Sequence, residues 1–94
     1  SCTVARESVD GAERRDLTDA QKEALLKELE TVQAVRRGTS DGKIGPYDQY
    51  VYRFSFENQQ EILMDDRGTL YTQKGGYAMT GDISCVLDLL NGWF

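Results

Sequence analysis

The chain has 94 residues, 39% hydrophobic and 29% charged, which predicts one soluble globular domain over residues 1–94. Its 11 Lys and Arg against 16 Asp and Glu give a formal net charge of -5, which argues against a nucleic-acid binder because phosphate contacts need clustered cations. The chain has no histidine and two cysteines, which excludes histidine-based catalytic triads, histidine metal sites and four-thiolate zinc sites.

Residues 1–16 are mostly polar, and Val4 and Val9 are isolated apolar residues within them. Such a segment buries little apolar surface, so we expect an extended polar arm, or a short edge strand or helical turn near Cys2. The compact core is then expected over residues 17–94.

A helix is predicted over about residues 18–31. Thr18 and Gln21 have the spacing of a capping box at its start. An isolated helix of this length is marginal in water, so its apolar stripe must pack against another element. The stripe consists of Leu25, Leu26, Leu29 and Val32.

Three to five antiparallel strands are predicted next, within residues 31–37, 47–56, 61–64, 69–72 and 77–80. Turn residues separate them at 38–42, 45–46, 57–60, 65–68 and 75–76, and the turn at 65–68 is expected to end in a left-handed glycine. Residues 47–56 alternate most clearly. One face of this strand should carry four aromatic side chains on which the leucine stripe packs: Tyr50, Tyr52, Phe54 and Phe56.

A final helix is predicted after Asp82, which can cap it, and Gly92 stands where it should end. The fold class is therefore α+β: an N-terminal helix, an antiparallel β-meander of three to five strands and a C-terminal helix. Both helices are expected on one face of the sheet, which leaves the other face to water or to a partner.

Cys2 and Cys85 have three interpretations. A disulfide between them would close almost the whole chain and would imply an oxidising compartment. Cys2 is alternatively a lipid-attachment cysteine. The third interpretation is two free thiols, with Cys85 a small buried helix residue.

No motif indicates catalysis, a metal or a cofactor. Glu61, Asp65 and Asp66 lack the alternate spacing of an EF-hand loop, and we interpret Asp65 and Asp66 as a hairpin turn. Residues 74–76 match no phosphate-binding loop. We therefore expect a protein that is not an enzyme and needs no cofactor.

Exposed tyrosines and acidic turns are the candidate binding groups. Tyrosine loses little conformational entropy on binding, and acidic turns attract a cationic partner. The competing interpretation is that these tyrosines only cover a small sheet. The candidate partner-binding residues are Tyr47, Tyr71, Tyr77, Asp65 and Asp66.

Roughly half of the chain resembles small extracytoplasmic domains of unknown function from Gram-positive bacteria, often lipoproteins. The likeness rests on the stretch 46–56, on Glu61 and on the segment Gly68-Thr69-Leu70-Tyr71. In those domains a helix precedes an aromatic-alternating hairpin and a Gly-x-Leu-Tyr-like return strand. The resemblance implies a secreted or lipid-anchored location and carries over no catalytic or ligand residue.

Two functions follow as expectations. The first is a non-enzymatic extracytoplasmic binding or interaction module for a protein or peptide, with a basic partner favoured by the acidity of residues 44–94. The alternative is a small acidic intracellular regulator, or immunity-type protein, that binds a basic enzyme. The state of the two cysteines distinguishes these locations, because a disulfide or a lipid on Cys2 would favour the first.

Overall fold

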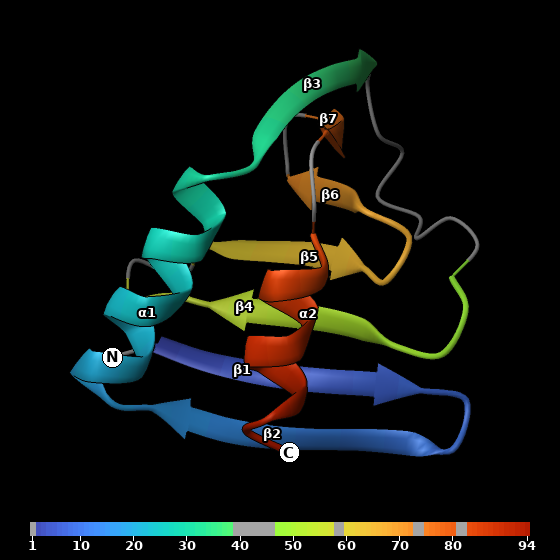
Figure 1. The fold of residues 1–94 in the computed structure, drawn as a ribbon. Helices are drawn as coiled ribbons and strands as arrows, with labels where there is room; N and C mark the ends of the chain where they lie inside the picture. The colour runs from blue at the N-terminus through green and yellow to red at the C-terminus, as the bar shows by residue number, and fades with distance from the viewer. Residues whose placement is uncertain (1, 39–46, 58–59, 73–74, 81–82) are drawn as a thin grey trace.

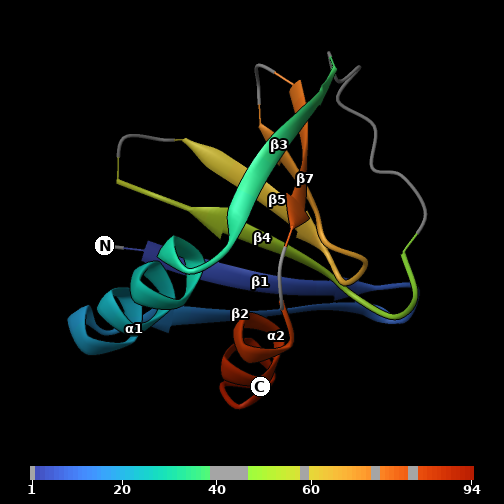
Figure 2. The same ribbon diagram turned by 45° about the horizontal axis from the view of Figure 1, so that its top comes forward.

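The computed structural model describes residues 2–38, 47–57, 60–72, 75–80 and 83–94. Its first element is a β-hairpin, so the predicted N-terminal helix is in fact the third element, between two strands. Both helices lie on one face of an antiparallel sheet, as expected (Figures 1 and 2). The elements in chain order are β1 Cys2–Ser8, β2 Gly11–Leu17, α1 Asp19–Glu30, β3 Gln33–Gly38, β4 Val51–Ser55, β5 Glu61–Asp65, β6 Thr69–Thr72, β7 Gly75–Thr80 and α2 Ser84–Asn91.

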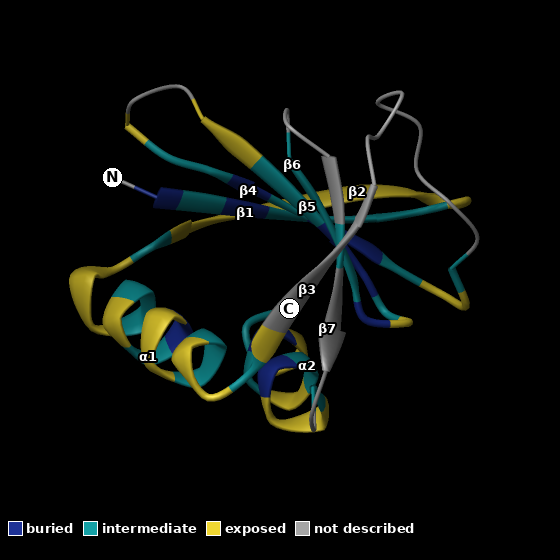
Figure 3. Cartoon of the chain, turned by 90° about the horizontal axis from the view of Figure 1, so that it is seen from above, coloured by how far each residue is buried: buried dark blue, intermediate teal, exposed yellow. Residues whose placement is uncertain are grey.

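The predicted polar arm within residues 1–16 is wrong, because residues 2–17 form the β1–β2 hairpin. β1 also pairs with β4, which places Cys2 and Val4 against the core, at 1% and 0% exposure. β2 is an edge strand and is exposed along nearly its whole length, so its sequence shows no apolar period (Figure 3). The Asp10-Gly11 pair was the hairpin signal in this segment.

The described strands form one sheet of seven, in the order β2-β1-β4-β5-β6-β7-β3. α1 connects the hairpin at one edge to β3 at the opposite edge, and thus crosses one face of the sheet (Figure 1). The predicted meander corresponds to β4 through β7, with β3 added beside β7. Residues 75–76 belong to β7, not to a turn, because Gly75 and Gly76 pair with Thr72 and Tyr71.

α1 begins with the predicted capping box: Thr18 Oγ1 accepts from the Gln21 backbone N–H at 3.1 Å, and Gln21 Oε1 accepts from the Thr18 backbone N–H at 2.9 Å. Leu25 is buried, and Leu29 packs beside it. Leu26 does not belong to the packed stripe, because it is 42% exposed.

The core lies between the two helices and the aromatic face of β4. This arrangement confirms the predicted packing of the α1 stripe on the aromatic residues of β4 and its two ends: Tyr52 and Phe54 in β4 are fully buried, and Tyr50 and Phe56, which flank it, are partly buried. The register aligns β4 with its neighbours on this face by pairing Phe54 with Val4 and Ile62. The buried cluster is Val4, Leu25, Tyr52, Phe54, Met64, Val86 and Leu90.

The remaining predictions concern turns and the last helix. Gly68 has φ 91°, which confirms the left-handed glycine at the end of the β5–β6 turn. Gly92 is the C-cap residue of α2, as predicted. Asp82 and the predicted turns within 39–46 and 58–59 lie outside the described residues.

Candidate functional site

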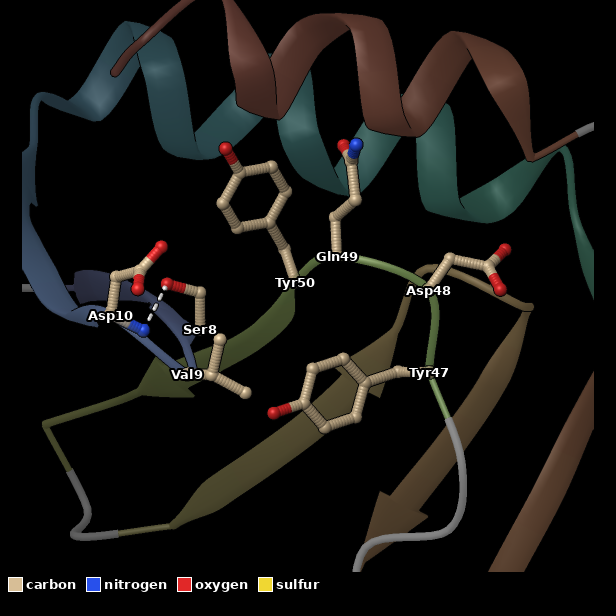
Figure 4. A pocket seen from close by; sticks show the side chains of 7 residues that line it. All are labelled: Ser8, Val9, Asp10, Tyr47, Asp48, Gln49 and Tyr50. Carbon is tan, nitrogen blue, oxygen red and sulfur yellow. Dashed lines mark hydrogen bonds between the residues drawn. The ribbon is translucent and has the colours of Figure 1, made fainter.

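A cleft of about 570 Å³ opens between the tip of the β1–β2 hairpin and the segment that precedes β4 (Figure 4). We call it the hairpin cleft. Figure 4 shows the ring of Tyr47 pointing toward Val9 from the opposite wall. The residues that line the cleft are Ser8, Val9, Asp10 and residues 47–50.

The hairpin turn forms one wall of the cleft. Ser8 and Gly11 pair at the end of the hairpin, so Val9 and Asp10 form a two-residue turn. Ser8 Oγ accepts a hydrogen bond from the Asp10 backbone N–H at 3.2 Å. Gly11 has φ 137°, a backbone conformation that residues with a Cβ rarely adopt. The turn holds Val9 at 91% exposure, which places an apolar side chain in solvent at the rim of the cleft.

Asp66 holds the opposite wall in place. Its carboxylate accepts three backbone N–H groups, from Asp48 and Gln49 at 2.7 Å each and from Tyr50 at 3.0 Å. Burial alone would raise the pKa of Asp66, but these three N–H donors outweigh it and lower the pKa. Asp66 was predicted to contact a partner. In the structure its carboxylate accepts these three backbone N–H groups and shapes the wall of the cleft.

Asp65 is not a surface group, so its predicted role in attracting a partner is wrong. The residue is 1% exposed. Its Oδ1 accepts from the backbone N–H groups of Arg67 and Thr69 at 3.0 and 2.9 Å, and its Oδ2 accepts from the Tyr71 hydroxyl at 3.1 Å. These bonds close the turn between β5 and β6, where a short carboxylate side chain satisfies backbone N–H groups.

The three candidate tyrosines lie in different places. Tyr47 lines the hairpin cleft. Tyr71 pairs with Leu63 on the face away from the helices, where its hydroxyl is bonded to Asp65. Tyr77 pairs with Leu70, on the helix-covered face. Only Tyr47 therefore belongs to the cleft.

The uncovered sheet face is cross-linked by ion pairs. Arg53 on β4 lies between Glu7 on β1 and Glu61 on β5, with N–O distances of 3.3 and 3.1 Å. The single positive charge of the guanidinium offsets one of the two negative charges on the neighbouring strands, which leaves less charge to attract a partner to the middle of this face.

Tyr50 connects the cleft to the helix-covered side of the sheet. The Arg6 guanidinium lies over the Tyr50 ring, 4.3 Å from its centroid, and over the Phe94 ring at 4.8 Å. The neighbouring Tyr52 hydroxyl donates to Asn91 Oδ1 of α2. Burial raises the pKa of Tyr52, so this hydroxyl stays protonated and remains a donor.

Six of the residues that line the cleft were missing from the sequence-based candidates: Ser8, Val9, Asp10, Asp48, Gln49 and Tyr50. The available signal was Asp10-Gly11, which indicates a turn near residue 10, but the structure places the two-residue turn one position earlier, at Val9 and Asp10. Tyr50 was assigned to the core by its alternation, and its half-buried ring serves both the core and the cleft.

Cys2 and Cys85 are free thiols, so the disulfide considered from the sequence is not formed in the structure. Cys2 is buried in β1, whereas Cys85 is exposed on α2 rather than buried as expected. A lipid on the Cys2 sulfur would require this side chain to leave its buried site.

The hairpin cleft offers groups for binding a cation. It combines the rings of Tyr47 and Tyr50 with the carboxylates of Asp10 and Asp48. Asp48 Oδ1 already binds the Arg67 guanidinium at 2.8 Å. Among the described residues, no three potential His, Cys, Asp or Glu ligands come together as a metal site.

The described helices include none with the length and hydrophobicity to cross a membrane. No family model matches the chain, and no significant match is found among curated proteins or solved structures.

Proposed function

We propose that the protein is a non-enzymatic binding module that recognises a basic peptide segment of a partner protein in the hairpin cleft. The observation that carries the proposal is the cleft itself, which joins aromatic, apolar and acidic groups in one open hollow of about 570 Å³. The predicted site on the open sheet face is thereby replaced by one at the end of the hairpin. A location outside the cytoplasm is part of the proposal and rests on the resemblance alone.

The aromatic rings support a cationic ligand. The Arg6 guanidinium on the Tyr50 ring shows that this ring already binds a cation within the chain. No described cation lies over the ring of Tyr47, which is half-buried and points across the cleft (Figure 4). A lysine or arginine of the partner can therefore stack on Tyr47 while its aliphatic stem contacts Val9.

The carboxylates support the same ligand. Asp10 is exposed, and no described side chain forms an ion pair with it. The pair of Asp48 with Arg67 is solvent-exposed, with the two side chains 63% and 52% exposed, so a guanidinium of the partner can compete for Asp48. The formal net charge of -5 adds long-range attraction for a basic segment.

The proposal is tested by titrating the isotope-labelled protein with short lysine-rich or arginine-rich peptides and following backbone amide signals by NMR. We expect shifts confined to residues 8–10 and 47–50, which weaken as salt is added. A glutamate-rich peptide of the same length should produce none.

The variant Asp10→Asn combined with Tyr47→Ala should lose this binding. The matched control is Asp88→Asn, which removes the same charge from an exposed position of α2. Equal binding by both variants, or shifts on the open sheet face instead, would show that the cleft is not the site.

A further inference from the structure

A second hollow lies between α1 and the sheet, away from the hairpin cleft. Its volume is about 150 Å³. Leu25 and Phe54 are fully buried at its base, at 1% and 2% exposure. Five partly buried side chains complete its walls: Leu29, Val32, Phe56, Ile62 and Leu70.

The side chains that line this pocket come from α1, β4, β5 and β6 and from residues just after α1 and β4. Leu25 and Leu29 project from α1, whose start is fixed by the capping box, and Val32 follows the helix. Phe54 of β4 pairs with Ile62 of β5, and Met64 of β5 pairs with Leu70 of β6, so these strands turn the same face toward α1. Five of the seven lining residues therefore lie in helices and strands, and Val32 and Phe56 lie just after α1 and β4.

The chemistry of the lining selects the occupant. All seven lining side chains are hydrocarbons, so a water molecule inside would find none of the two to four polar partners that it needs from them. Closed apolar cavities of this volume accept benzene-sized molecules, and this hollow, which is partly open to solvent, has a similar volume and an apolar lining. Among the described residues no charged or polar side chain lines the pocket, so a charged ligand would lose its hydration without compensation from them.

We propose that this pocket is a binding site for one small, uncharged apolar molecule, with a single ring or a short branched alkyl group. Its volume accommodates one such group, because it matches cavities that bind one benzene. The partly buried side chains around the buried base provide the route of entry. The site is independent of the hairpin cleft, which shares no lining residue with it.

The test is an NMR titration of the methyl-labelled protein with benzene and, separately, indole, up to the solubility limit of each. We expect ring-current shifts on the methyl groups of Leu25, Leu29, Ile62 and Leu70, and no shift on the exposed methyl groups of Val9. Benzoate, the charged analogue, should leave the spectrum unchanged.

Two variants on the same helix provide the control. Leu29→Trp fills the pocket and should abolish the benzene-induced shifts, whereas Leu26→Trp adds the same side chain at a position that is 42% exposed and should keep them. Circular dichroism establishes that both variants are folded, and Val32→Phe replaces Leu29→Trp if the latter is not.

Three results would overturn the proposal. The first is the absence of methyl shifts with both benzene and indole. The second is an equal response of the two helix variants. The third is preferential binding of a leucine-bearing or phenylalanine-bearing peptide over benzene, which would assign the pocket to the anchor residue of a protein partner instead.

Discussion

Replacing Asp66 by Ala tests how the wall of the hairpin cleft is held. The substitution removes the acceptor for three backbone N–H groups, at 2.7, 2.7 and 3.0 Å, in the segment that precedes β4. A hydrogen bond to a charged acceptor contributes about 1.5 to 3 kcal/mol, and less where water can replace the acceptor. The bond from Tyr50 is partly buried, and those from Asp48 and Gln49 are exposed. Counting the partly buried bond in full and the exposed ones at about 0.5 kcal/mol each gives a loss of about 2.5 to 4 kcal/mol in unfolding free energy.

Asp48→Ala is the matched control, because it removes a carboxylate from the segment that Asp66 binds but keeps the backbone N–H that Asp48 donates to Asp66. The Asp48 side chain forms an ion pair with Arg67 in which both partners are more than half exposed. Such pairs contribute about 0 to 1 kcal/mol, so the control should lose far less stability. Urea denaturation followed by circular dichroism measures both variants, and tryptophan fluorescence of Trp93 provides a second probe.

The contribution of Asp66 to the unfolding free energy should also decrease at acidic pH. Its pKa is raised by burial but lowered overall by the three N–H donors, so the folded state favours the ionised carboxylate. This stabilisation is complete above the ordinary carboxyl pKa of about 4 and is lost as the pH falls through the lower pKa of the folded state. The stability difference between wild type and Asp66→Ala should therefore be constant near neutral pH and narrow in acid. An Asp66→Ala variant as stable as Asp48→Ala, or a difference that widens in acid, would refute the reasoning.

Three further predictions concern the core, the helix start and the cysteines. Phe54→Ala should lower the unfolding free energy by about 3 to 5 kcal/mol because it empties a buried ring site, and a near-neutral effect in urea denaturation would place the core elsewhere. Thr18→Ala should cost about 1 kcal/mol by breaking the capping box, with Thr18→Ser as the control that keeps the hydroxyl acceptor. Cys85 should react with a thiol reagent in the native protein, whereas Cys2 should react only after denaturation, because it is buried and its burial raises its thiol pKa. Intact mass after timed labelling measures this order, and equal rates for the two cysteines would contradict the buried position of Cys2.

The central part of the fold could be predicted from the sequence because its signals are local. Thr18 and Gln21 have the spacing of a capping box, and the helix begins there. The alternation from Tyr50 to Phe56 identified the core face of β4, since side chains in a strand alternate between the two faces. Gly68 is also a local signal: it ends the predicted turn in a left-handed conformation, which a residue without a Cβ adopts most readily.

Position within the sheet was not determined by these local signals. β1 becomes an inner strand only because β4, more than 40 residues later in the chain, pairs with it, and this pairing buries Cys2 and Val4. β2 remains at the edge, where backbone hydrogen bonds to β1 suffice and no apolar alternation is required.

Asp65 and Asp66 show, for the candidate site, the same difference between what local sequence signals predict and what strand pairing decides. The sequence by itself determined that Asp65 and Asp66 belong to a turn, since short acidic side chains bond to backbone N–H groups there. Only the tertiary structure decided which N–H groups each receives: Asp65 bonds within its own turn, whereas Asp66 reaches a segment 16 to 18 residues earlier. That long-range contact depends on the pairing of β4 with β5, and it forms the wall of a cleft whose other wall comes from the first hairpin. A cleft between segments distant in sequence exists only after strand pairing brings them together, so its residues have no common pattern in the sequence.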